Sequence, residues 1–85
     1  MHIEATRTFI RLYKKLPPDL MRKMKKALEL LQANPAHPSL GHKKMAGQED
    51  IFEIRISKNY RITYQKVGDT AYLRKIGTHN LLRTP

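Results

Sequence analysis

Two arginines and one histidine in the C-terminal half of the chain have the chemistry needed to hold a phosphate and to move a proton beside it. Arg55 and Arg61 stand in two runs of alternating apolar and polar residues, and His79 follows the last such run. A guanidinium stays charged at every relevant pH and can donate two parallel hydrogen bonds to a phosphate. An imidazole titrates near neutrality and can accept or donate a proton. These residue types suggest acid–base chemistry on a bound anion, if the fold brings them together.

Each of these residues also has a purely structural interpretation. The arginines can pair with Glu53 across strands or simply face solvent, and a single histidine in a loop is commonly a turn or surface residue. However, Asp69 is the only acidic residue after Glu53, so little acid is available to neutralise the arginines. This imbalance favours an anion site.

Other kinds of site find little support in the sequence. It has no Gly-rich phosphate loop, no nucleophile elbow and no paired-carboxylate pattern. It contains no cysteine, and the spacing of His37 and His42 does not suit a zinc site. We therefore expect neither a metal nor a cofactor.

Length and charge restrict the possibilities further. The 85 residues predict a single domain over residues 1–85, and 17 Lys and Arg against 7 Asp and Glu give a net charge of +10. Such a charge favours nucleic acid, a membrane surface or an acidic protein as partner, although a solvated basic surface is the plainer alternative. No apolar run approaches the roughly 20 residues of a membrane span, and the N-terminus does not resemble a signal peptide. We expect a cytoplasmic protein that does not bind a membrane.

Two amphipathic helices are predicted in the N-terminal half. Thr6 is a suitable N-cap for a first helix whose apolar stripe extends to Leu16, and Pro17 and Pro18 should end that helix and open the next. The second helix should run from Asp19 until Asn34-Pro35 stops it, with "RKMKK" on a solvated face that could also touch RNA. The region 35–50, rich in Pro and Gly, is expected to be irregular.

The C-terminal half predicts three antiparallel strands within 51–57, 60–66 and 70–77, with a further short strand possible at residues 2–5. The fold class is therefore α+β, with a helical hairpin packed on a small antiparallel sheet. A three-residue loop over 58–60 would pair Ser57 with Arg61 and keep charges off the apolar face. Arg55 would then lie diagonally across from Arg61 on the polar face.

Several stretches resemble the RelE/ParE superfamily of toxins from type II toxin–antitoxin pairs. They are "HPSLGHKKMAG", "FEIRISKNYRITYQ" and the terminal "LRKIGTHN". The resemblance implies a fold similar to that of microbial ribonucleases. For RelE-like members it also implies a metal-independent endoribonuclease that cleaves mRNA in the A site of the 70S ribosome. In that reaction the 2′-hydroxyl attacks the adjacent phosphate and leaves a 2′,3′-cyclic phosphate.

The resemblance also implies roles for individual residues. Arg61 matches the strand arginine that acts on the phosphate, and Arg55 stands where RelE has a lysine and the YafQ branch a histidine. His79 matches the C-terminal histidine of YafQ-like toxins, which acts in acid–base catalysis. Glu53 replaces another lysine of RelE, and His42 lies close to an upstream histidine of YafQ; either is a candidate partner for His79. The candidate RNA contacts are Lys43, Lys44, Lys58, Tyr60, Arg74 and Arg83.

The same resemblance leaves a second function open. ParE-like members share the fold but inhibit DNA gyrase by binding to it, without nuclease chemistry. In either case the positive charge suits an acidic antitoxin whose disordered segment folds on binding. The expected partners are thus a cognate antitoxin and, for a nuclease, mRNA on the ribosome.

Overall fold

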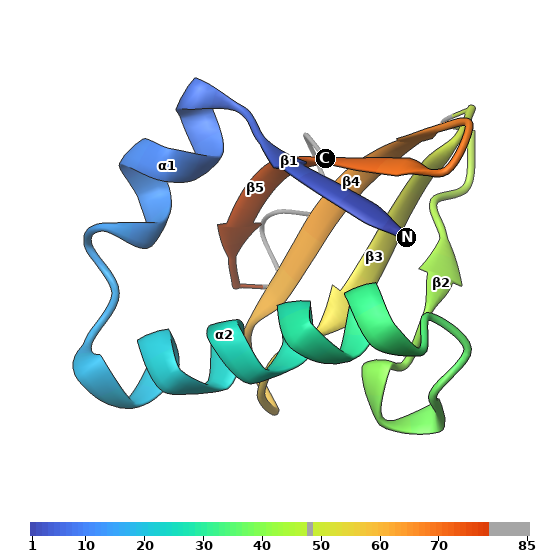
Figure 1. Ribbon diagram of the computed structural model, residues 1–85. Coiled ribbons are helices and arrows are strands. Elements are labelled where there is room, and N and C mark those ends of the chain that lie inside the picture. Colours follow the sequence, from blue (N-terminus) through green and yellow to red (C-terminus); the bar gives the residue numbers. More distant parts are fainter. Residues whose placement is uncertain (48, 79–85) are drawn as a thin grey trace.

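A computed structural model describes residues 1–47 and 49–78, and in them two α-helices pack on one face of a five-stranded sheet (Figure 1). In chain order the elements are β1 (His2–Ala5), α1 (Arg7–Tyr13), α2 (Pro18–Ala33), the 3₁₀ helix η1 (Pro38–Leu40), β2 (Lys43–Lys44), β3 (Ile51–Arg55), β4 (Arg61–Val67) and β5 (Thr70–Gly77). The predicted α+β class is confirmed. No helix in this part of the chain is long and apolar enough to cross a membrane.

The sheet has the strand order β1-β5-β4-β3-β2. The predicted antiparallel meander is its β3–β4–β5 portion, and the short N-terminal strand is present as β1, which runs parallel to β5. The sheet is therefore mixed. Strand β2, only two residues long, was not predicted, because two lysines without apolar alternation carry no strand signal.

Helix α1 begins where predicted but ends earlier. The Thr6 side chain accepts a hydrogen bond from the Phe9 amide at 3.2 Å, which caps the helix. The helix ends at Tyr13 and not next to Pro17, because the amide of Leu16 turns back to the Tyr13 carbonyl in a tighter turn. Leu16 nevertheless packs against the core, so its place in the apolar stripe is retained.

Helix α2 supplies most of the helical surface that covers the sheet. It has Pro18 in its first turn and ends at Asn34, as predicted. Met24, Ala27 and Leu31 are buried against the sheet. With Phe9 of α1 and the apolar face of β3, β4 and β5 they form one core.

The β3–β4 register differs from the prediction by two residues. The loop has the expected three residues but spans 57–59, since the Ile56 amide donates to the Tyr60 carbonyl at 3.1 Å. Arg61 consequently pairs with Arg55 and not with Ser57. The Ser57 hydroxyl favours the earlier turn by accepting a hydrogen bond from the Tyr60 amide. A shift of two residues leaves every side chain on its predicted face.

Thr6 joins α1 to the sheet, and its loss should destabilise the fold. Its hydroxyl caps the helix and donates to the Leu73 carbonyl of β5 at 2.7 Å. We expect Thr6→Ala to lower the free energy of unfolding by about 1–2 kcal/mol, measured by urea denaturation. Thr8→Ala, in the same helix, is the control and should change it by less than about 0.5 kcal/mol. Equal losses in the two variants would contradict the capping role.

Candidate nucleic-acid interface

Arg55 and Arg61 are direct cross-strand neighbours on the sheet face that points away from the helices. They pair at the end of the β3–β4 ladder, next to the loop. Side chains of directly opposed residues lie about 5 Å apart at Cβ, and like charges there repel each other. Neither arginine forms an ion pair with any described residue. The arrangement therefore concentrates positive charge that an anion can neutralise.

The Arg61 guanidinium is fixed by the loop before it. Its Nη1 donates to the carbonyls of Ser57 at 2.8 Å, Tyr60 at 3.0 Å and Lys58 at 3.2 Å. These bonds satisfy one nitrogen and leave Nε and Nη2 without a hydrogen-bond partner in the described chain. Arg61 is thus held in place while part of its donor edge remains available to a ligand.

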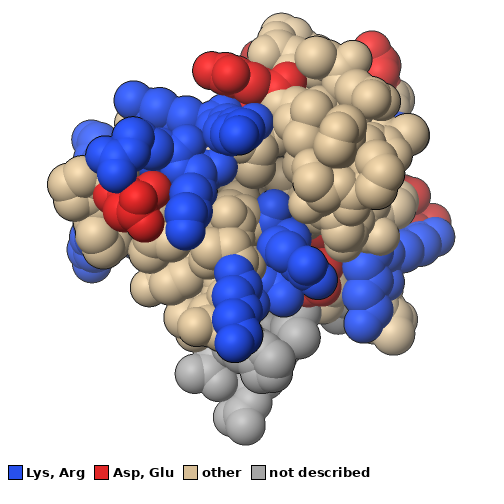
Figure 2. Space-filling model, turned by 90° about the horizontal axis from the view of Figure 1, so that it is seen from below, with Lys and Arg blue, Asp and Glu red and all other residues tan. Residues whose placement is uncertain are grey.

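Arg55 lies over Gly41, at the edge of the sheet. A Cβ built on Gly41 would approach the Arg55 Cβ to 3.6 Å and its Nε to 3.7 Å, and Gly41 has a φ of +53° that disfavours other residues. From this position the Arg55 side chain reaches around the sheet edge towards α2 and borders a groove of about 230 Å³ that also includes Lys23 and Lys26 of α2 and Ser39. The Arg61 guanidinium bends instead towards the loop carbonyls. Figure 2 shows Lys and Arg side chains gathered around a hollow on this side of the molecule.

Glu53 lies on the same sheet face, two residues before Arg55, but it is buried. It pairs with Lys43 on one side and with Thr63 on the other, and only 8% of its surface is exposed. Its Oε2 has no hydrogen-bond partner within the described residues. Buried carboxylate oxygens normally have a partner, so this atom is a candidate proton acceptor beside the arginines.

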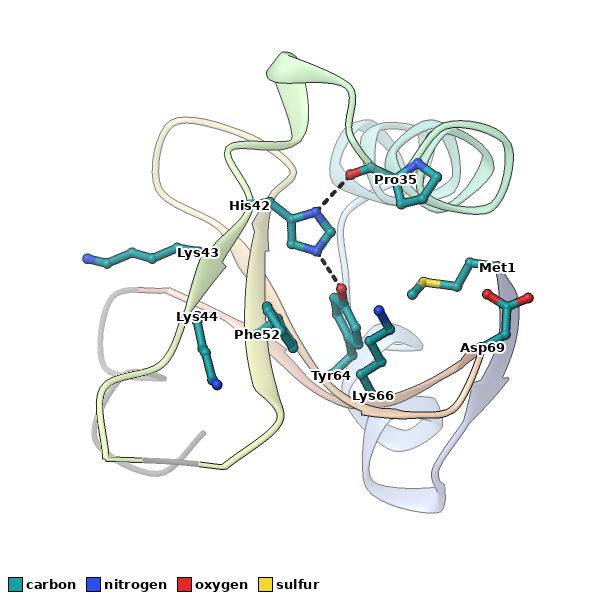
Figure 3. A pocket seen from close by; sticks show the side chains of 9 residues that line it. All are labelled: Met1, Pro35, His42, Lys43, Lys44, Phe52, Tyr64, Lys66 and Asp69. Carbon is teal, nitrogen blue, oxygen red and sulfur yellow. Dashed lines mark hydrogen bonds between the residues drawn. The ribbon is translucent and has the colours of Figure 1, made fainter.

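His42 lies on the other side of the sheet, towards the helices (Figure 3). Its Nδ1 donates to the Pro35 carbonyl at 2.8 Å, which leaves Nε2 of the neutral ring to accept a hydrogen bond from the Tyr64 hydroxyl. Both ring nitrogens are therefore engaged. The structure does not bring His42 to the arginines, and its role is to connect the end of α2 to the sheet.

The Tyr64 phenol is held in its neutral form by this environment. The side chain is 1% exposed, and burial raises the pKa of Tyr64 from 10.0 to about 12. It therefore remains a hydroxyl at any physiological pH and can keep its hydrogen bond to His42.

The other sequence candidates are distributed around the sheet. Lys43 lies on the same sheet face as the arginines and Lys44 on the opposite face, because their strand-pairing partners are Glu53 and Phe52, respectively. Lys58 is exposed in the loop, whereas Tyr60 packs against the core and does not stand free to stack on a base. Arg74 is the extra residue of a bulge in β5. His79 and Arg83 lie outside the described residues.

One further basic residue, Lys75, lies on the same sheet face as Arg55 and Arg61, and the sequence did not predict it there. Lys75 pairs with Thr63, next to the Arg61–Gly77 pair. The bulge at Arg74 interrupts the two-residue alternation of β5, so a simple reading of the pattern could not assign Lys75 to a face. The indication in the sequence is that "LRKI" does not alternate strictly between apolar and polar residues, which is typical of a bulge.

The sequence matches one family model over most of its length. That model is described as the ParE toxin of type II toxin-antitoxin system, parDE, and it covers residues 3–80. No significant match is found among curated proteins.

Solved structures share this fold. The toxin in the RelB–RelE antitoxin–toxin complex of Methanococcus jannaschii is 24% identical, with a TM-score of 0.77 and 94% of each chain covered. That in the E. coli DinJ–YafQ complex is 18% identical, with a TM-score of 0.78 and 94% of this chain and 93% of that chain covered. That in the intact E. coli RelBE complex is 20% identical, with a TM-score of 0.73 and 91% and 94% covered.

The raised pKa of Tyr64 predicts a loss of stability at high pH. The folded chain holds the phenolic proton more tightly than the unfolded chain does, so this contribution is complete below pH 10 and is lost as the pH rises to about 12. We expect the free energy of unfolding to fall less steeply across this window in Tyr64→Phe than in the wild type, as measured by urea denaturation at a series of pH values.

Tyr72→Phe is the matched control, because the Tyr72 side chain is 40% exposed. It should keep the wild-type slope. An unchanged slope in Tyr64→Phe would mean that burial does not stabilise the neutral phenol.

Proposed function

The chain belongs to the ParE toxin family of type II toxin–antitoxin systems, within the RelE/ParE superfamily, and we propose that it acts as a metal-independent endoribonuclease on mRNA in the ribosomal A site. The observation that supports this most directly is the pair of opposed arginines, Arg55 and Arg61, with no carboxylate partner among the described residues. Two guanidinium groups that start from opposed positions on neighbouring strands suit a phosphate whose negative charge grows during the reaction.

Cleavage requires three functions at the scissile phosphate. A base takes the proton of the 2′-hydroxyl, whose oxygen attacks the phosphorus. Positive charge stabilises the pentacoordinate phosphate, and an acid protonates the 5′-oxygen as its bond to phosphorus breaks. Arg55 and Arg61 supply the charge in this proposal. His79 supplies the base, the acid or both, with Glu53 as its complement.

The position of His79 along the chain suits this role. Gly77, the last residue of β5, pairs with Arg61, and His79 follows two residues later. Two residues of extended chain span at most about 7 Å, so the chain length allows an imidazole beside the arginine pair. The remaining RNA contacts in this proposal are Lys43 and Lys58 on the same side, with Arg74 and Arg83 further along the chain.

A gyrase inhibitor is the second candidate, and the description of the matching family model favours it. Such a toxin would act by protein binding and would need no general acid or base. The two candidates therefore differ in whether RNA ends are produced.

The proposed partner, in cells whose growth is not arrested, is an acidic antitoxin. The similar structures named above are toxin–antitoxin complexes, and a net charge of +10 favours an acidic protein. An acidic segment that reaches Arg55 or Arg61 would compete with RNA for the same charges.

Induced expression in bacterial cells separates these two functions. We expect new mRNA 5′ ends within codons, in frame with translation, while plasmid supercoiling stays unchanged. His79→Ala should abolish both the new ends and growth arrest, because the proton transfer would be lost. His2→Ala, which removes an exposed histidine bound only to Glu4, should remain fully toxic. Relaxed plasmid DNA with intact mRNA would refute the nuclease in favour of gyrase inhibition.

Replacement of Arg55 tests the phosphate site. Removing one donor to a developing negative charge typically lowers a rate by about 100- to 1,000-fold, and we expect this for Arg55→Gln in mRNA cleavage on purified ribosomes. Because the side chain is exposed and its loss relieves the repulsion from Arg61, the unfolding midpoint should stay the same or rise slightly. Arg11→Gln on α1 is the charge-matched control and should cleave like the wild type. Wild-type cleavage by Arg55→Gln would exclude it from the site.

A further inference from the structure

A second concave site lies on the opposite side of the sheet from the arginines. A pocket of about 270 Å³ opens beyond the C-terminal end of α2, where the helix no longer covers the sheet (Figure 3). Its floor presents the half-buried Phe52 and the exposed His42, with Tyr64, only 1% exposed, packed beneath them. Lys44, Lys66 and Asp69 stand at its rim. Nothing in the proposed cleavage reaction uses these residues.

The floor is aromatic and held in one geometry. The rings of Phe52 and Tyr64 are stacked, with centroids 5.5 Å apart and planes 18° apart. His42 meets both rings edge-on at 5.8 Å and 5.5 Å, and its two hydrogen bonds prevent it from rotating. Such a floor needs no rearrangement to receive a flat apolar group, which keeps the cost of binding low.

Among the described residues, the rim carries more positive than negative charge. Neither Lys44 nor Lys66 forms an ion pair with a described residue, and Asp69 is the only carboxylate on the lining. Lysine ammonium groups beside an aromatic floor select a ligand that has a flat ring at one end and a negative charge at the other.

We propose that this pocket binds one nucleotide of single-stranded RNA, with the base against the aromatic floor and its phosphate between Lys44 and Lys66. At about 270 Å³ the pocket is slightly smaller than typical ligand sites, which measure about 300–1,000 Å³, so it suits a single nucleotide better than a peptide segment. The inference rests on the proposed function, because RNA is the ligand that the opposite face would cleave.

Strand β2 connects the two sites. It forms the outer edge of the sheet, and its two lysines alternate between the faces. Lys43 also borders the pocket, but the end of its side chain extends away from Phe52 and Tyr64 in Figure 3, whereas Lys44 lies beside Phe52. Each face of the sheet extends about 10 Å from β2 to β4 at the usual strand spacing, so an RNA strand of several nucleotides that passes around β2 can contact both sites. The pocket would then contribute to the choice of cleavage position.

The test is an NMR titration of the ¹⁵N-labelled protein with adenosine 5′-monophosphate, uridine 5′-monophosphate and inorganic phosphate. These probes have no internucleotide bond and cannot be cleaved. We expect amide shifts at residues 44, 52 and 66, with at least one nucleotide binding more tightly than phosphate. Phe52→Leu should raise the dissociation constant about 5- to 100-fold, as loss of base stacking typically does. Lys44→Gln should weaken the binding of nucleotide and of phosphate alike. Lys25→Gln, at an exposed position of α2, should change neither affinity.

Three results would overturn the inference, and one would separate it from the proposed nuclease. Shifts confined to the Arg55–Arg61 side would exclude the pocket as a nucleotide site while leaving the nuclease intact. Pocket shifts in a chain that produces no mRNA ends in cells would refute the nuclease and keep the nucleotide site. Tighter binding of a short glutamate-rich peptide with one tyrosine than of any nucleotide would assign the pocket to a protein partner. Unchanged binding in both Phe52→Leu and Lys44→Gln would exclude it as the binding site.

Discussion

The pairing of Ile54 with Ile62 determines where every other side chain of the β3–β4 ladder points. Both are fully buried against the helices. Burying one such side chain is worth about 1.5–3 kcal/mol, whereas opposed cross-strand side chains contribute about 0.2–1 kcal/mol. The apolar pair therefore outweighs the repulsion between Arg55 and Arg61, which are the next residues along the two strands. The hydrophobic core imposes the cationic pair on the outer face.

The edge of the sheet depends on a different set of contacts. β2 has only two residues, and the segment before it is attached by the His42 hydrogen bonds to Pro35 and Tyr64 and by the left-handed turn at Gly41. Gly41 also lies against the Arg55 side chain, and its φ of +53° rather than lack of space is what favours glycine there. The same short segment thus forms one wall of the aromatic pocket and borders the arginine on the other side of the sheet.

Periodicity predicted most of this fold, and the exceptions have physical reasons. The second helix, the three long strands and the faces of β3 and β4 followed from apolar spacing, whereas the bulge in β5 hides the face of that strand. The β3–β4 register did not, because the Ser57 hydroxyl and the Arg61 guanidinium stabilise a turn that side-chain alternation cannot detect. The arginine pair was placed on the correct face, but His42 was associated with it on the basis of resemblance. Only the strand pairing of its neighbours shows that it belongs to the other face.

The charge distribution links stability, inhibition and substrate binding. Directly opposed arginines are unfavourable without an anion, and the chain offers them no carboxylate partner within its described residues. Any anion that binds only the folded chain there stabilises it, by an amount that rises with the logarithm of the anion concentration divided by its dissociation constant once the site is mostly occupied. An acidic protein and an RNA backbone can each supply such an anion. They compete because both bind to the same arginines. If the chain cleaves RNA as proposed, the feature that binds its substrate also makes it sensitive to an acidic inhibitor.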